Sequence, residues 1–335
     1  MENSDPSSIS PSAYTLLFMK RHTEIPYIRE AAALVENKLR QAETAGAGPT
    51  FIPQFSTDPA GYGIFLLHFE DRYWSIDQLM ADLPITNMLE LSSGFSFRGL
   101  DLSRRKPVYY IDTDLPGLIA VKQSLVDDLL AGEQSAGGTP PDSSAADPTP
   151  GTPPGHYELQ TLDVLDPDAF AAIVARFPPG PLVILNEGLL VYLDTTQKEQ
   201  LCTNIRKALE ARGGYWITAD IYIRNPADNP PAGQDPAANP NPAASPSPAA
   251  SEQYTQWQAW KNQFQIEQKK FSGFAKAQAF FTRMGYKIDK EATPDYPRLT
   301  SLPFLRTTAG PQFLEHLRQR GRLRLRTTWR LTLQS

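Results

Sequence analysis

Cysteine and histidine are scarce in this sequence. One cysteine, Cys202, and four histidines occur among 335 residues. A single cysteine excludes an intrachain disulfide and a thiolate metal cluster, and the wide spacing of the histidines argues against a zinc site. Long apolar runs are also missing, because 63–69 and 181–193 are too short or too polar to span a bilayer. The N-terminus lacks the basic and apolar regions of a signal peptide, so we expect a soluble cytoplasmic protein without a metal site.

Proline is unevenly distributed, and two stretches hold 14 of the 31 prolines. These stretches, 131–155 and 225–251, contain no Lys, Arg or aromatic residue, and their five acids equal the whole net charge of −5. Because such segments cannot bury enough apolar area to offset the entropy of ordering, we predict disordered insertions. The sequence thus predicts a polar tail at 1–12 and a single domain at 13–335, interrupted twice, which we expect to be a monomer.

Apolar and amphipathic segments alternate along the rest of the chain. This order is typical of an α/β fold with a doubly wound, mostly parallel sheet. We expect a helical cap before the sheet, including a helix over 25–41, and a closing antiparallel pair at 286–290 and 323–333. The predicted parallel strands cover 85–91, 108–116, 157–163, 181–188 and 215–223, and the predicted helices cover 118–130, 167–177, 197–212 and 271–284. Thr196 and Glu199 have the spacing of a capping box for the helix over 197–212.

Acidic residues follow four successive predicted strands. Ligands of open α/β sheets bind at the carboxyl ends of the strands, so these residues should share one edge. A ligand could use all of these residues if it contained a nucleoside that packs against small residues, a vicinal diol, an exocyclic amine and an α-ammonium group. S-adenosylmethionine has these groups. A dinucleotide site is disfavoured, because its Gly-x-Gly-x-x-Gly motif is missing. The residues at the strand ends are Glu90, Ser92, Ser93, Gly94, Asp112, Asp114, Asp163 and Glu187.

Three segments of the chain match the motifs of one enzyme family. Glu187-Gly-Leu-Leu-Val-Tyr-Leu193 looks like a Glu-Gly-x-x-x-Tyr-Leu signature. Tyr110-Ile-Asp-Thr-Asp-Leu-Pro116, followed by Lys122, looks like an acid-x-Asp-x-Pro segment, and Arg72-Tyr-Trp-Ser-Ile-Asp77 is similar to an Arg-x-x-x-Ile-Asp element. In this chain order, the segments resemble the leucine carboxyl methyltransferase family of S-adenosylmethionine-dependent O-methyltransferases, which includes polyketide carboxyl methyltransferase-like members.

The resemblance implies a class I methyltransferase fold of the Rossmann-like type, with S-adenosylmethionine as cofactor. The family commonly has Gly-x-Gly after the first strand, whereas Ser92 replaces the first glycine here. A serine fits this turn if its φ stays negative, but its side chain reduces the space in which the ligand can approach the backbone. Arg72 would bind the methionine carboxylate of the cofactor and Glu187 its ammonium group. The ribose would be bound by Asp114 rather than Asp112, and the adenine by Asp163 and Val164. The small residues Ser92 and Gly94 would allow the nucleoside to approach the backbone closely.

Methyl transfer to a carboxylate of a small or medium-sized molecule is the reaction that we predict. A carboxylic acid with a reference pKa of about 4 is ionised at neutral pH, so no general base is required. Alignment of the acceptor with the methyl group would suffice, and we assign no catalytic residue. A cation should hold the acceptor, with Arg21, Lys20 and Arg224 as choices. Tyr192 is either a substrate contact or a core aromatic.

Other interpretations of the sequence remain open. A protein with the same fold could serve as a binding scaffold, if the altered glycine turn no longer holds a cofactor. An RNA-linked carboxyl methyltransferase is disfavoured, because 322–326 alternates like a half-buried strand with one solvated face and the chain outside the insertions has no net charge. Arg72, taken alone, would be read as a surface residue paired with Glu70, Asp71 or Asp77.

Overall fold

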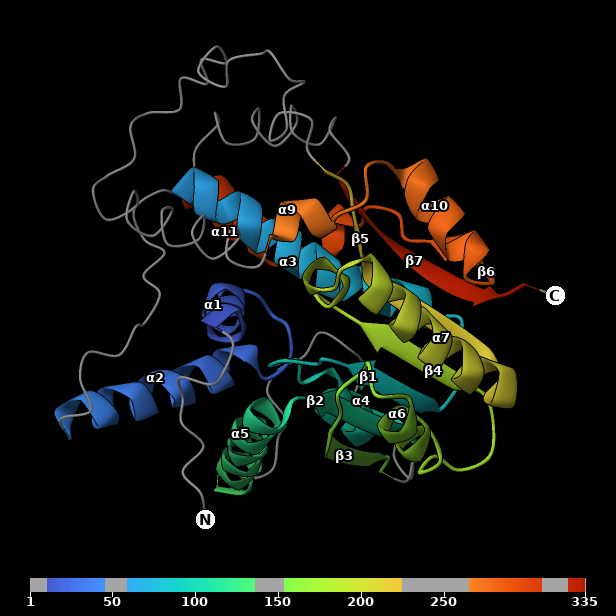
Figure 1. Ribbon diagram of the computed structural model, residues 1–335. Helices are drawn as coiled ribbons and strands as arrows, with labels where there is room; N and C mark the ends of the chain where they lie inside the picture. Colours follow the sequence, from blue (N-terminus) through green and yellow to red (C-terminus); the bar gives the residue numbers. More distant parts are fainter. Residues whose placement is uncertain (1–10, 46–58, 136–153, 225–264, 309–324, 335) are drawn as a thin grey trace, which may run out of the picture.

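A seven-stranded sheet forms the centre of the molecule (Figure 1). The computed structural model describes residues 11–45, 59–135, 154–224, 265–308 and 325–334. The strand order is β3-β2-β1-β4-β5-β7-β6, in which β1 to β5 pair in parallel and β7 is antiparallel to both of its neighbours. The strands are β1 (Asn87–Leu91), β2 (Tyr109–Asp114), β3 (His156–Thr161), β4 (Leu182–Asn186), β5 (Gly214–Tyr222), β6 (Tyr286–Glu291) and β7 (Arg326–Leu333). The predicted mixed sheet with a closing antiparallel pair is confirmed.

Helices alternate with the parallel strands and cover both faces of the sheet. Along β4, Leu182 and Ile184 pack in a cluster with α6, α7 and α10, whereas Val183 and Leu185 pack with residues of α3. Both β1 and β4 are buried at every residue, as central strands of a parallel sheet are. The helices after β1 are α4 (Arg98–Arg105), α5 (Pro116–Ser135), α6 (Pro167–Val174), α7 (Thr195–Arg212), α9 (Ile266–Lys269), α10 (Phe274–Arg283) and α11 (Ser301–Thr308).

Three N-terminal helices, α1 (Pro11–Lys20), α2 (Ile28–Thr44) and α3 (Pro59–Met80), form the predicted cap. Helix α3 packs beside β5, β7 and α11, and α1 packs against both α2 and α3. Because Lys20 at the end of α1 contacts Glu187 just after β4, α1 approaches the carboxyl ends of the strands. Within the described ranges, the helices are all too short or too polar to cross a membrane.

The described structure differs from the predicted tail and first insertion at their edges. Helix α1 begins at Pro11, two residues before the predicted start of the domain, and residues 1–10 lie outside the described part. Helix α5 continues to Ser135, well into the predicted insertion. Glu133 holds this turn, because it accepts from the Tyr27 hydroxyl at 2.9 Å and pairs with Arg104 at 2.8 Å. Residues 136–153 and the second insertion lie outside the described residues.

The capping box of α7 lies two residues before the predicted one. Asp194 accepts from the backbone N–H of Gln197 at 2.9 Å, and the Gln197 side chain accepts from the backbone N–H of Asp194 at 2.9 Å. The prediction of Thr196 and Glu199 was therefore wrong. Asp194 has the extended backbone that an N-cap requires, and its carboxylate accepts from the backbone N–H of the third residue of the helix.

Strand β7 is buried from Thr327 to Leu331, and most of the segment that was predicted to be a half-solvated strand, 322–324, lies outside the described residues. It lies between β5 and β6, so Arg330 is buried and Arg326 is nearly so. Arg326 pairs with Asp71, and Arg330 pairs with Asp82 and Asp289 at 2.5 Å each. Both arginines are therefore paired with carboxylates of the described structure.

Candidate functional site

The turn after β1 holds two residues in the left-handed region. Ser92 has φ 48° and Gly94 has φ 53°. The condition for a serine to fit this turn, a negative φ, is therefore not met, and Ser92 adopts a conformation that a glycine would adopt more easily. The backbone N–H of Gly94 donates to Asp114 Oδ2 at 2.8 Å, which links the turn after β1 to the end of β2.

Asp114 lies at the carboxyl end of β2, half-buried and next to a hydrophobic side chain that is exposed. Its second oxygen, Oδ1, accepts from the backbone N–H of Leu115 at 2.8 Å. Burial raises the pKa of Asp114, and the hydrogen bonds from Gly94 and Leu115 oppose this rise. The Leu115 side chain is 58% exposed, although most large apolar side chains of the described structure are buried. The end of β2 thus offers a carboxylate and an apolar surface side by side.

Asp112 has a different environment, because its side chain points into the core. It accepts from Lys122 Nζ and from the Tyr157 hydroxyl, both at 2.7 Å, and its carboxylate and Lys122 are fully buried. Lys122 also donates to Ser93 Oγ at 2.9 Å. Asp112 therefore supports the turn after β1 through Lys122.

Glu90, in β1, lies opposite Asp112 in the sheet register. Its side chain accepts from the Tyr110 hydroxyl at 2.5 Å. Burial and the neighbouring Asp112 raise the pKa of Glu90 to about 7. Among the described residues, Glu90 Oε1 and Asp112 Oδ1 are buried without a hydrogen-bond partner. Two buried carboxyl groups thus lie side by side beneath the turn.

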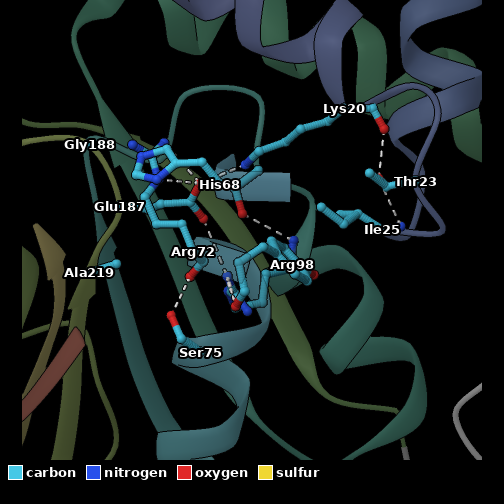
Figure 2. A network of polar contacts seen from close by, with 12 residues as sticks. Lys20, Thr23, Ile25, His68, Arg72, Ser75, Arg98, Glu187, Gly188 and Ala219 are labelled. Carbon is cyan, nitrogen blue, oxygen red and sulfur yellow. Dashed lines mark hydrogen bonds and ion pairs between the residues drawn. The ribbon is translucent and has the colours of Figure 1, made fainter. Parts of the chain in front are cut away.

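Glu187, directly after β4, is the centre of a buried ionic cluster (Figure 2). Lys20 Nζ donates to Glu187 Oε1 at 2.6 Å and Arg72 Nε donates to the same oxygen at 3.0 Å. Arg98 Nη2 lies 3.6 Å from Glu187 Oε2, which has no hydrogen-bond partner in the described structure. Burial alone would raise the pKa of Glu187, but Lys20, Arg72 and Arg98 outweigh it and lower that pKa to about 2. Arg72 is therefore a buried member of this ionic cluster and does not form a surface ion pair.

Arg98, the third cation of this cluster, was not identified from the sequence. Its guanidinium lies 3.8 Å from the centroid of the Tyr73 ring and pairs with Asp77. Asp77 belongs to the same motif as Arg72, so the motif supplies one direct partner of Glu187 and one indirect one. The sequence does not show where the turn after β1 ends and the helix with Arg98 begins. No spacing of residues in the sequence would therefore have predicted a contact between Arg98 and Glu187.

Asp220, near the end of β5, was also missed. Its carboxylate accepts from Asn186 Nδ2 at 2.7 Å and from the backbone N–H groups of residues 188–190 at 2.6–3.1 Å. These bonds fix the segment that carries Glu187. The available signal was the end of the fifth strand, because Asp220 follows the same rule as the acids that end the first four strands.

His68 of α3 and Tyr222 of β5 form a polar pair next to this cluster. The distance from His68 Nε2 to the Tyr222 hydroxyl is 2.8 Å, and Arg72 Nη1 donates to that hydroxyl at 3.3 Å. Burial, Arg326 and Arg72 lower the pKa of His68 well below its usual value, so the imidazole is neutral at pH 7. Burial raises the pKa of Tyr222.

The remaining sequence-predicted residues are placed as follows. Asp163, after β3, is exposed and accepts from the Leu165 backbone N–H at 3.0 Å, while the Val164 side chain is buried. Arg21 pairs with Glu36 at 3.5 Å, away from the Glu187 cluster. Tyr192 is half-buried, and its carbonyl accepts from Lys269 at 2.8 Å. Arg224 donates to the backbone carbonyls of Gln268 and Lys270. Of the three cations considered for binding the acceptor, Lys20 is the one that contacts Glu187.

Comparison with known proteins finds distant likenesses in structure. Neither the protein-family models nor the curated proteins contain a match. A DUF574 family protein from Streptomyces avermitilis MA-4680 is 14% identical, with 99% of this chain and 100% of that chain covered and a TM-score of 0.48. LepI in complex with SAM is 11% identical, with 85% of this chain covered and a TM-score of 0.38, and the match spans about half (49%) of the length of LepI. Magnesium protoporphyrin IX methyltransferase (ChlM) from Synechocystis PCC 6803 with bound SAH is 8% identical, with 85% of this chain and 90% of that chain covered and a TM-score of 0.41. The resemblance to the leucine carboxyl methyltransferase family stays a prediction.

Proposed function

We propose that this chain is an S-adenosylmethionine-dependent O-methyltransferase with a sheet of the class I methyltransferase type. The observation that carries the proposal is the state of Glu187. Its Oε1 is bound by Lys20 and Arg72, whereas its buried Oε2 lacks a hydrogen-bond partner in the described structure. The orphan oxygen of Glu187 would accept from the ammonium of an amino-acid zwitterion. The three cations around Glu187, which are Lys20, Arg72 and Arg98, would attract the carboxylate of that zwitterion.

The adenosine half of the cofactor fits the other strand ends. Asp114 would accept from the ribose hydroxyls, since each of its oxygens holds one backbone hydrogen bond and has a further lone pair. Leu115 supplies an exposed apolar surface for the adenine ring, and Asp163 an exposed carboxylate for its amino group. Asp112 does not fit a direct role, because its carboxylate is fully buried and its Oδ2 already accepts from Lys122 and Tyr157.

The bound cofactor would supply an electrophilic methyl group. The residues of the chain would then bind and orient: Asp220 fixes the loop of Glu187, and Lys122 fixes the turn after β1 through Ser93. Helix α1 brings Lys20 over the strand ends, which would exclude water from the methionine half. Alignment of acceptor oxygen, methyl carbon and sulfur within a dry site is sufficient for transfer to an ionised acceptor, and no general base is needed.

Isothermal titration calorimetry with S-adenosylhomocysteine tests the proposal. The wild-type chain should bind, and Glu187→Gln and Asp114→Asn should each weaken binding by about 10-fold or more, because each removes a charge-assisted hydrogen bond worth about 1.5–3 kcal/mol. Glu210→Gln is the matched control, since Glu210 is an exposed partner of Arg206 on α7 and should leave the affinity unchanged. Wild-type affinity in both site variants would refute the assignment.

A binding scaffold without cofactor is the second candidate, and the left-handed Ser92 favours it. A side chain at this turn strains the backbone where the nucleoside would approach. The same titration separates the two functions. A folded wild-type chain that shows no heat of binding with millimolar S-adenosylhomocysteine supports the scaffold.

A further inference from the structure

A pair of carboxyl groups lies in the core beneath the turn after β1. Glu90 of β1 and Asp112 of β2 are partners in the parallel register, so their side chains leave the same face of the sheet from strands about 4.8 Å apart. Both residues are fully buried. Neither carboxyl group is among the proposed contacts of the cofactor, so a bound ligand does not account for this arrangement.

Each carboxyl group of the pair has one oxygen that is hydrogen-bonded and one that is not. Glu90 Oε2 accepts from the Tyr110 hydroxyl at 2.5 Å. Asp112 Oδ2 accepts from Lys122 Nζ and from the Tyr157 hydroxyl, both at 2.7 Å. Glu90 Oε1 and Asp112 Oδ1 are buried without a hydrogen-bond partner in the part of the chain that the structure describes. A proton on Glu90 Oε1 makes it a donor, and donation to Asp112 Oδ1 would satisfy both oxygens at once.

The charges around the pair also favour one proton on Glu90. Lys122 pairs with Asp112, and Arg98 pairs with Asp77. Burial and the charge of Asp112 raise the pKa of Glu90 to about 7, although Arg98 and Lys122 oppose this rise. The titratable groups that face Glu90 are Asp112 and Tyr110 of β2, Tyr157 of β3, Tyr73 of α3, Arg98 of α4 and Lys122 of α5. Burial raises the pKa of all three tyrosines well above the ordinary value, so their hydroxyls stay neutral.

Lys122 connects the carboxyl pair to the turn after β1. Its Nζ donates to Asp112 Oδ2 at 2.7 Å and to Ser93 Oγ at 2.9 Å. The backbone N–H of Ser93 donates to the Thr113 carbonyl at 2.9 Å, so the turn is also joined to β2. An ionised Glu90 adds a second carboxylate that attracts the same ammonium group. The hydrogen bond from Lys122 to Ser93 is then weakened, and the turn loses a support from the core.

We propose that Glu90 holds a proton shared with Asp112, and that loss of this proton loosens the turn after β1 and weakens cofactor binding. The identity of the ligand rests on the proposed function, whereas the buried proton does not. As the pH rises, one proton leaves Glu90 Oε1 for water, and no other covalent bond changes. Because the pKa of Glu90 is raised, the proton is held below about pH 7 and is lost above it. The chain should therefore bind the cofactor more tightly on the acidic side of neutrality.

Nuclear magnetic resonance of the full-length chain, labelled with ¹³C at the glutamate side-chain carboxyl, tests the buried proton. The Glu90 resonance should titrate with a midpoint at about pH 7. Asp112→Asn should lower this midpoint, because the neighbouring negative charge is removed. Two variants identify the resonance independently, by its loss in Glu90→Gln and by its shifted midpoint in Asp112→Asn.

Calorimetry with S-adenosylhomocysteine at about pH 6 and about pH 8 tests the response of the site. Wild type should bind about 10-fold more weakly at the higher pH, as expected when a hydrogen bond from a charged group is lost. Glu90→Gln has the shape of the protonated side chain and should bind with equal affinity at both pH values. Glu210→Gln is the matched control, because Glu210 is an exposed partner of Arg206 and its substitution should keep the wild-type pH dependence.

Three results would overturn the inference while the proposed function stands. They are a Glu90 carboxyl group that is already ionised at about pH 5, equal wild-type affinity at both pH values, and a Glu90→Gln variant that keeps the wild-type pH dependence. A wild-type chain that binds no S-adenosylhomocysteine at either pH would overturn the proposed function itself. The titration of the Glu90 resonance needs no ligand, so it would still decide whether the carboxyl pair holds a proton.

Discussion

Substitution of Asp220 by Asn tests how the loop that carries Glu187 is held. Asp220 Oδ1 accepts from the backbone N–H of Gly188 at 2.7 Å, and Oδ2 accepts from Asn186 Nδ2 and from two further backbone N–H groups. All of these groups are buried or half-buried. An asparagine side chain at this position keeps one oxygen that accepts hydrogen bonds and has an NH₂ group in place of the other oxygen. This NH₂ donor would face the backbone N–H of Gly188, which is also a donor.

The cost of Asp220→Asn follows from the bonds that change. The introduced amide would keep three bonds through its oxygen, each weaker by the loss of charge, and would leave the Gly188 N–H unsatisfied. An unsatisfied buried donor costs about 1–3 kcal/mol, and hydrogen bonds to a charged group exceed neutral ones by about 1 kcal/mol each. We expect a loss of about 4–6 kcal/mol in the free energy of unfolding. For a chain of this size, the melting temperature should fall by about 6–9 °C.

Thermal melting by circular dichroism measures the stability, and calorimetry well below the melting transition measures S-adenosylhomocysteine affinity while the variant remains folded. Affinity should fall by about 10-fold or more, because Glu187 is no longer held in place. Asp127→Asn is the control, since Asp127 accepts one exposed hydrogen bond from Gln123 on α5 and should change stability by less than about 0.5 kcal/mol. An Asp220→Asn variant that melts within about 2 °C of wild type and binds equally well would refute the reasoning.

Three further predictions concern the turn, the buried pair and the ionic cluster. Ser92→Gly should stabilise the chain by about 0.5–1 kcal/mol in urea unfolding, because relief of a left-handed residue exceeds the added freedom of glycine in the unfolded chain; a less stable variant would contradict this. Lys122→Met should cost about 3–5 kcal/mol by leaving Asp112 buried and unpaired, and adding Asp112→Asn should recover part of that loss, whereas additive losses would argue against the pair. The lowered pKa of Glu187 means that its contribution is complete above its ordinary value of 4.5 and is lost as pH falls towards about 2. The difference in unfolding free energy between wild type and Glu187→Gln should therefore shrink over this window, and a constant difference would contradict the ion cluster.

The ends of the parallel strands are where the sequence located most of the acidic residues of the candidate site. Apolar runs of strand length and the acids that follow them are local features, and parallel strands bring their carboxyl ends to one edge without further information. Asp114 and Glu187 were found in this way. Asp220 obeys the same rule and was missed because only four strand ends were compared. Asp112 and Asp114 are two residues apart on one face of β2, so the sequence could not show which of them the core would bury.

The partners of Glu187 come from distant parts of the chain. Lys20 is 167 residues away and Arg72 is 115 residues away, and each arrives on a helix of the cap. Local pattern gives the existence of these helices but not their orientation, which depends on packing among α1, α2 and α3. Lys20 is the last residue of α1 and contacts Glu187, whereas Arg21 follows the helix and pairs with Glu36.

The sequence by itself determined the alternation of strands and helices, the order of acids along the chain and the closing antiparallel pair, because periodicity and residue type act over a few residues. The tertiary structure alone decided which of these groups are buried, which cations share Glu187, and that Ser92 occupies a left-handed turn. These outcomes depend on desolvation and on contacts between segments far apart in the sequence. Both are properties of the packed molecule, and no local pattern of residues specifies them.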